Sequence, residues 1–212
     1  MNLTERSGLG AVAVSVGDAL RRQGIKAVLS GGACASLYTR GAFQSVDVDF
    51  ILIGHARQSE LDVAMASLGF IRRGDRYRHP RARFYVEFPR GPLAIGKDYA
   101  VRPVSRKTRY GQTLALSATD SCRDRLAAFY HWNDRQSLKV AIWIALRNRV
   151  DLDTVRRWSL DEGFADRFAE FLAEVRRTRA RRRAGASAST PSSTMRMVGG
   201  GVRVYVERRR PP

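Results

Sequence analysis

Residues 26–53 read KAVLSGGACASLYTRGAFQSVDVDFILI, and this stretch decides the fold of the chain. The short apolar run at residues 26–30 indicates a strand that ends at a pair of glycines. A segment of small residues with helical character follows. Residues 45–53 are rich in β-branched and aromatic side chains, which is typical of a second strand. The sequence therefore predicts a strand, a glycine pair, a helix and a strand in succession.

Two aspartates lie two residues apart in the second predicted strand. Successive side chains of a strand point to opposite faces, so Asp47 and Asp49 should share one face and Val46, Val48 and Phe50 the other. Two neighbouring carboxylates repel each other unless a divalent cation lies between them, and Mg²⁺ prefers one or two carboxylates together with substrate phosphates. A helix that begins directly after glycines also offers free N–H groups to phosphates. The stretch is suited to holding a nucleoside triphosphate and its metal ion.

The pattern Gly31-Gly32 followed by Ser45-Val46-Asp47-Val48-Asp49 resembles the signature of the polymerase-β-like nucleotidyltransferase superfamily. It is most similar to the small bacterial members grouped with the abortive-infection toxin nucleotidyltransferases. Strands and helices alternate up to about residue 116, which predicts an α/β or α+β domain. The resemblance implies a small mixed-sheet nucleotidyltransferase core flanked by helices and followed by a C-terminal helical bundle.

Enzymes of this superfamily complete a two-metal site with a third carboxylate from a neighbouring strand. Glu87 is the best candidate, because it lies on the polar face of the alternating segment 83–88. The alternative is a surface glutamate paired with Arg83 or Arg90. The superfamily more often has aspartate at this position. Two further acidic residues in turn-like segments, Asp75 and Asp98, are rivals.

Small residues around the glycine pair are candidates for nucleotide binding. Gly31 and Gly32 would let the backbone approach a triphosphate closely, and a tight strand-to-helix turn would require them as well. The hydroxyl groups of Ser30 and Ser45 can donate to phosphate oxygens. For Ser45, capping of the strand end is an equally good interpretation.

Polar residues also gather on the helices that follow the sheet. In the abortive-infection relatives, such a helix carries a lysine or arginine and an aspartate that hold nucleotide phosphates or the base. Arg123, Asp124 and Arg125, with Asp134 and Lys139, are similar in kind but do not match residue by residue. We assign Arg125 and Lys139 to nucleotide binding. A structural ion pair between Arg125 and Asp134 is the alternative for Arg125.

The resemblance implies a Mg²⁺-dependent nucleotidyltransferase, with Mn²⁺ as a substitute metal, that binds metal through Asp47, Asp49 and Glu87. It would move a nucleoside monophosphate from an NTP to an acceptor hydroxyl. The abortive-infection relatives suggest a toxin acting on RNA, such as tRNA, or on protein, with an antitoxin protein as partner. A different class of function is a catalytically inactive module with this fold that binds RNA or serves as a toxin–antitoxin partner.

The formal net charge of +18 favours polyanionic partners such as nucleotides and nucleic acids. An arginine-rich composition that serves only as solvated surface is the alternative. Cys34 and Cys122 are isolated and show no ligand spacing, so we expect a reducing, cytoplasmic location. No apolar run approaches the roughly 20 residues that span a bilayer, and we expect no membrane association.

The chain divides by composition into a nucleotidyltransferase core at residues 1–116, a helical subdomain at 117–180 and a basic tail at 181–212, which we expect to be disordered. Residues 101–112 are basic and irregular, and residues 113–116 are a strand or a link. Thr119 or Asp120 is the expected cap of the first helix of the subdomain. Apolar spacing predicts helices near residues 9–23, 61–68, 117–130, 138–146, 151–160 and 164–175.

Overall fold

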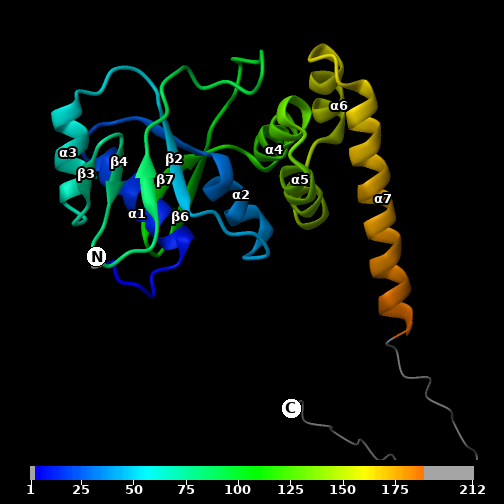
Figure 1. Ribbon diagram of the computed structural model, residues 1–212, viewed down its shortest axis with the longest axis horizontal. Helices are drawn as coiled ribbons and strands as arrows, with labels where there is room; N and C mark the ends of the chain where they lie inside the picture. The colour runs from blue at the N-terminus through cyan, green and yellow to red at the C-terminus, as the bar shows by residue number, and fades with distance from the viewer. Residues whose placement is uncertain (1–2, 189–212) are drawn as a thin grey trace, which may run out of the picture.

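The computed structural model describes residues 3–188. Its strands form one sheet of seven, and helices flank the sheet and continue the chain beyond it (Figure 1). The strands are β1 Ala27–Ser30, β2 Asp47–Leu52, β3 Ile71–Arg73, β4 Arg76–Arg78, β5 Tyr85–Glu87, β6 Val104–Thr108 and β7 Gly111–Ala115. The helices are α1 Leu9–Arg22, α2 Gly31–Thr39, α3 Gln58–Ala66, α4 Ala118–Trp132, α5 Arg135–Arg147, α6 Leu152–Asp161 and α7 Ala165–Ala188.

The sheet is mixed, with the strand order β3-β4-β5-β2-β1-β7-β6. Strand β1 pairs with β2 in antiparallel and with β7 in parallel orientation, and β2 pairs with β5 in parallel orientation. The outer pairs β3–β4, β4–β5 and β6–β7 are antiparallel. The expected α/β (α+β) class is confirmed, and β2, which carries the two aspartates, lies in the middle of the sheet.

Helices α1 and α3 cover one face of the sheet. Gly17 of α1 lies directly against Thr113 of β7, where a Cβ atom would overlap the threonine side chain. On the same face, the Tyr77 hydroxyl of β4 donates to Asp62 Oδ1 of α3 at 2.5 Å. Phe50 of β2 is fully buried between these elements. Phe50 and Val48 of β2 thus lie on the face covered by α1 and α3, and Asp47 and Asp49 lie on the opposite face.

Residues 104–115 form a strand hairpin, β6–β7, where the sequence indicated an irregular segment at 101–112 followed by a strand or a link. The register pairs Arg106 with Thr113 and Thr108 with Gly111. Strand β6 lies at the edge of the sheet and has no fully buried residue, so it lacks the apolar alternation that marks a strand in a sequence. Pairing with β7, rather than burial, determines its conformation.

The N-cap of the first helix after the sheet lies two or three residues earlier than expected. Ser117, and not Thr119 or Asp120, is the N-cap of α4, and its Oγ accepts from Asp120 N at 3.0 Å. The Asp120 carboxylate in turn accepts from Ser117 Oγ at 2.7 Å. The Thr119 hydroxyl accepts instead from Asp151 N, at the start of α6. A serine followed three residues later by an acidic residue forms a reciprocal cap, so both groups serve one helix end.

Helices α4 to α7 lie together on one side of the sheet, and α7 extends past the end of α5 (Figure 1). Helix α7 continues to Ala188, so residues 181–188, which we expected to belong to a disordered tail, are helical. The rest of that predicted tail lies outside the described residues. Cys34 and Cys122 are both buried as free thiols. No helix of residues 3–188 is long and apolar enough to cross a bilayer.

Candidate active site

The glycine pair lies where β1 turns into α2. Gly31 has a φ of 61°, in the left-handed region that side chains other than glycine rarely adopt. A Cβ atom at this position would overlap Asp49 Oδ2. Ser30 lies opposite Asp49 in the β1–β2 register and is the N-cap residue of α2. Gly31 is therefore required both for the backbone turn and for the close approach of the Asp49 carboxylate.

The second glycine has a different neighbour from the second strand. A Cβ atom on Gly32 would lie 2.5 Å from Ser45 Oγ and 2.9 Å from Ser45 Cβ. The Ser45 hydroxyl donates to Asp47 Oδ1. Ser45 thus packs against the start of α2 and orients one carboxylate of the aspartate pair, and the two glycines and the two aspartates form one interlocked unit.

The two aspartates share the face of β2 that is turned away from α1 and α3. Val48 and Phe50 point to the other face and are fully buried, as the alternation predicted. Val46, which was expected to join them, is 64% exposed, because it precedes the first residue of β2 and lies outside the sheet.

The β2–β5 register places the third expected carboxylate beside this pair. Asp49 is directly opposite Glu87, and Asp47 is directly opposite Tyr85. Neighbouring strands lie about 4.8 Å apart, so the Glu87 carboxylate shares the open face with both aspartates. Burial raises the pKa of Asp49 to about 7, and the negative charges of Asp47 and Glu87 add to the effect. Partial burial and the two neighbouring carboxylates therefore disfavour the negatively charged form of the Asp49 side chain.

Glu87 has a partner that the sequence did not indicate. Arg76 Nε lies 2.6 Å from Glu87 Oε1, whereas we expected Arg83 or Arg90 as the alternative partner of this glutamate. The β4–β5 register explains the pairing, because it places Arg76 directly opposite Glu87. The contact is electrostatic and lacks hydrogen-bond geometry, so Oε1 is a buried oxygen without a hydrogen-bond partner among the described residues.

The acidic side chains are neighbours, but they do not form a finished metal site. No group of three or more His, Cys, Asp or Glu side chains within residues 3–188 is gathered closely enough to hold a metal ion. The chemistry of the donors nevertheless fits a divalent cation. Asp49 experiences repulsion from Asp47 and Glu87, and Glu87 has an unsatisfied buried oxygen. A cation with oxygen ligands would relieve both.

An arginine from α4 faces the carboxylates. The Arg125 side chain is 18% exposed, and its Nε and Nη2 atoms donate to Asp124 Oδ2 at 2.9 and 2.7 Å. Burial disfavours the charge of Arg125, but the carboxylates of Asp124, Asp49 and Asp134 raise its pKa overall. The direct partner is Asp124. Asp134, the partner considered from the sequence, caps α5 by accepting from Gln136 N and Ser137 N.

Lys139, the other basic residue assigned to the nucleotide, lies on α5. Its side chain is exposed, and its Nζ atom lies 5.3 Å from the centre of the Trp143 ring, one turn along the helix. Within the described part of the chain, no ion pair joins Lys139 to a carboxylate. The structure thus brings Arg125 near Asp49, whereas the contact that it shows for the Lys139 ammonium group is with the Trp143 ring.

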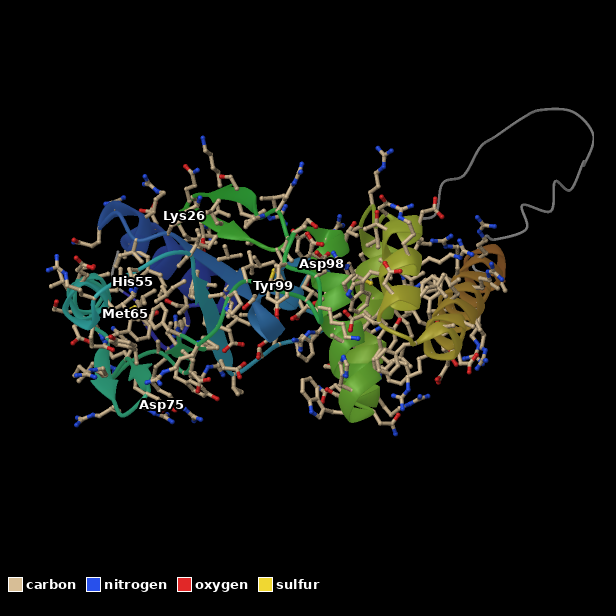
Figure 2. All side chains as sticks on the ribbon, turned by 90° about the horizontal axis from the view of Figure 1, so that it is seen from above. Lys26, His55, Met65, Asp75, Asp98 and Tyr99 are labelled. Atoms are coloured by element: carbon tan, nitrogen blue, oxygen red, sulfur yellow. The ribbon has the colours of Figure 1, made fainter. Side chains whose placement is uncertain are left out.

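The two rival acidic residues lie elsewhere. Asp75 is in the β3–β4 turn at the outer end of the sheet, and Asp98 is in the segment beside α4, as Figure 2 shows. Asp98 forms an ion pair with Arg123 and accepts from Ala100 N at 2.8 Å. Asp124 was mentioned among the polar helix residues but was not assigned to the site. In the structure it accepts hydrogen bonds from Arg125 and contributes to the raised pKa of Asp49.

Comparison with solved structures identifies the fold. The structure of an antigenic nucleotidyltransferase-like protein from Paracoccidioides brasiliensis superposes with a TM-score of 0.50 at 13% identity, covering 87% of this chain and 94% of that one. The chain has a nucleotidyltransferase-like fold. The antibiotic-resistance factor ANT(2'')-Ia matches with a TM-score of 0.41 at 12% identity, over 85% of this chain and 97% of that one. No protein-family model and no curated protein sequence matches this chain.

Proposed function

We propose that this protein is a Mg²⁺-dependent nucleotidyltransferase that moves a nucleoside monophosphate from an NTP to an acceptor hydroxyl. The observation that carries the proposal is the register of Asp47, Asp49 and Glu87 on one open face, directly beside the glycine turn that begins α2. The turn leaves backbone N–H groups free for a triphosphate. The nucleotidyltransferase-like fold agrees with it.

Each residue has a defined task in this proposal. Gly31 and Gly32 bring the backbone close to the phosphates, and the Ser30 hydroxyl donates to a phosphate oxygen. The Ser45 hydroxyl donates to Asp47 Oδ1 in the structure and would turn from it to donate to a phosphate oxygen. Arg125, held by two hydrogen bonds to its neighbouring aspartate, offers its remaining N–H groups to the triphosphate.

The carboxylates of Asp47, Asp49 and Glu87 would hold Mg²⁺, with Mn²⁺ as a substitute. Bound metal would neutralise the triphosphate and the departing pyrophosphate. The acceptor hydroxyl oxygen forms the new bond to the α-phosphorus, the bond to pyrophosphate breaks, and the hydroxyl proton passes to water.

The test uses NTPs labelled at either the α- or the γ-phosphate, incubated with the protein, Mg²⁺ and total cellular RNA or protein. Transfer of the α label but not of the γ label to a macromolecule is expected, and the Asp49→Asn variant should abolish it. Asp153→Asn, which changes an exposed acidic residue of α6, serves as the control and should retain transfer. Transfer of the γ label would indicate a kinase and would contradict the proposal.

The resemblance to abortive-infection toxins extends the proposal to the cell. A toxin that modifies RNA or protein would arrest growth when expressed, and an antitoxin protein would relieve the arrest. Growth arrest by the wild type that is absent with Asp49→Asn would support this role. Equal arrest by both would show that the effect does not depend on nucleotidyl transfer.

The second candidate is an inactive RNA-binding or toxin–antitoxin partner module with the same fold. It is favoured by the Arg76 contact with Glu87 and by the lack of a gathered metal-ligand set in residues 3–188. Such a module would bind RNA in a salt-sensitive manner with no effect of Mg²⁺ or NTP. Metal-dependent NTP binding by the wild type would exclude it.

A further inference from the structure

The face of the sheet that carries the carboxylates continues onto β4 and β3, where its charged side chains are positive. One row of register partners runs from Asp49 to Glu87, then to Arg76 and Arg73. With strands about 4.8 Å apart, the arginines of this row lie about 10 and 15 Å from Asp49. An acidic centre on β2 and β5 therefore adjoins a basic surface on β4 and β3.

A second row lies beside the first on the same face. It runs from Asp47 to Tyr85, then to Arg78 and Ile71. We call Arg73, Arg76 and Arg78 the hairpin arginines. Figure 2 shows nitrogen-tipped side chains gathered around this hairpin, on which Asp75 is labelled. Both rows thus lead from carboxylates to the same pair of outer strands.

The hairpin arginines differ in how far their charge is compensated. Arg76 contacts Glu87 at 2.6 Å and Asp75 at 3.7 Å. Arg73 and Arg78 are exposed, and neither forms an ion pair with a carboxylate of the described chain. By contrast, Arg72 points to the other face, where its Nε lies 3.4 Å from an aspartate of α3. Two uncompensated guanidinium groups therefore face the same solvent as the carboxylates.

Tyr85 links the acidic and basic parts of this face. The guanidinium carbons of Arg76 and Arg78 lie 4.8 and 5.2 Å from its ring centre. Its phenolic hydroxyl is a hydrogen-bond donor on the same face as Asp47, the register partner of Tyr85. Ile71, 53% exposed, adds an apolar contact at the outer end.

We propose that the hairpin arginines bind the phosphodiester backbone of a single-stranded RNA acceptor, whose terminal hydroxyl lies at Asp49 and Glu87. The inference rests on the proposed nucleotidyl transfer at the same site. The arginines begin on β4, two strands from β2, and continue to β3 at the edge of the sheet. The acceptor must therefore carry several negative charges at a distance from its reacting hydroxyl. Phosphodiesters recur in this way, and guanidinium groups bind them well. The Tyr85 hydroxyl gives the ribose 2′-hydroxyl a partner.

A local probe can separate this surface from the other basic regions of the chain. The native cysteines are both buried, so a fluorophore can be attached selectively to Ile71→Cys on the hairpin. Val63→Cys, 55% exposed on α3, is the matched control on the opposite side of the sheet. A uridine oligonucleotide should change the fluorescence at position 71 and not at position 63. An equal response at both positions, or RNA binding without a response at position 71, would overturn the inference.

Charge variants of the full chain complete the test. Neutralising two phosphate contacts should lower the slope of log affinity against log salt by about 1.4 for single-stranded nucleic acid. Arg73→Gln/Arg78→Gln should show this loss and a roughly tenfold weaker response at position 71 at low salt, whereas Arg72→Gln should leave both unchanged. An unchanged slope in the double variant, or an equal response to DNA or polyglutamate, would contradict the proposed RNA acceptor.

NTP binding separates this inference from the function on which it rests. The Arg73→Gln/Arg78→Gln variant should keep the Mg²⁺-dependent stabilisation by NTP, because neither arginine contacts the glycine turn or the carboxylates. If the wild type shows that stabilisation but no RNA response on the hairpin, the RNA surface alone is wrong. If the wild type shows no such stabilisation, the proposed function fails.

Discussion

The contact between Gly32 and Ser45 allows the geometry of the candidate site to be tested by stability alone. Gly32 has an ordinary helical φ, so Gly32→Ala should stabilise α2 by about 0.5–1 kcal/mol where space permits. In this protein the new Cβ would lie 2.5 Å from Ser45 Oγ and 2.9 Å from Ser45 Cβ. Overpacking of this kind costs about 1–3 kcal/mol. Gly32→Ala alone should therefore be destabilising by up to about 2 kcal/mol.

A second substitution, at Ser45, should turn the effect of Gly32→Ala from destabilising to stabilising. In a Ser45→Gly background both overlapping atoms are gone, and the nearest remaining atom is Phe43 Cε1 at 3.6 Å, an ordinary contact. Gly32→Ala should then stabilise the protein by about 0.5–1 kcal/mol. The coupling free energy between the two positions is the overpacking cost, about 1–3 kcal/mol.

Urea unfolding of the four proteins, followed by tryptophan fluorescence, measures this coupling. Gly8→Ala combined with Ser45→Gly is the control, because a Cβ on Gly8 meets no atom within 4 Å and the two changes should be additive. If Gly32→Ala has the same effect in both backgrounds, Ser45 does not pack against the start of α2. The described arrangement of the glycine pair and the aspartate strand would then be incorrect.

Three further outcomes are expected. Gly31→Ala should lower the unfolding free energy by about 1–2 kcal/mol for the left-handed backbone alone. It should also weaken Mg²⁺-dependent NTP binding in calorimetry, because the new Cβ displaces the Asp49 carboxylate, and unchanged binding would contradict the close packing. Burial raises the pKa of Asp18, but its hydrogen bonds and adjacent arginines lower it overall. Asp18→Asn should therefore lower the unfolding free energy by about 1–2 kcal/mol at neutral pH and by progressively less as pH falls below about 4. A difference that does not change with pH would show that the Asp18 charge is not its cause. Arg123→Met should lower the unfolding free energy by about 3–5 kcal/mol, because it leaves the largely buried Asp120 carboxylate without its cation; a loss below about 1 kcal/mol would show that the pair is dispensable.

Local patterns predicted the centre of this fold well. The apolar runs around the glycine pair gave β1, α2 and β2 in the correct order, because both strands are central and their buried faces follow the period of a strand. The helices of the C-terminal part were also found from apolar spacing. Such elements carry their own signal, since each buries one face against the rest of the protein.

Elements at the edge of the sheet gave less signal. Strand β6 has partly exposed and exposed residues only, and basic side chains obscure its alternation. The cap of α4 was misplaced because Ser117, Thr119 and Asp120 are all good capping residues, and the choice depends on where β7 ends. These features follow from tertiary contacts that no short window of sequence contains.

The sequence indicated the positions of the acidic residues better than those of their partners. Glu87 lies directly opposite Asp49, and the alternation of its strand had placed it on the polar face. Its pairing with Arg76 depends on the β4–β5 register. Arg125 was selected, but its partner is Asp124, the adjacent residue, and not the more distant aspartate considered from the sequence. Long side chains choose partners by rotamer and burial, which sequence spacing does not specify.

The central claim is that Asp47 and Asp49 hold a metal–nucleotide complex, and thermal unfolding with each NTP, with and without Mg²⁺, tests it most directly. A ligand at about 100 times its Kd stabilises the native state by about 2.7 kcal/mol, or roughly 5–10 °C for a chain of this size. We predict a shift of this order that requires Mg²⁺, is lost in Asp47→Asn/Asp49→Asn and persists in Asp153→Asn, a change on the exposed face of α6. A wild type that no NTP stabilises in the presence of Mg²⁺, or an aspartate variant that keeps the shift, would contradict the account.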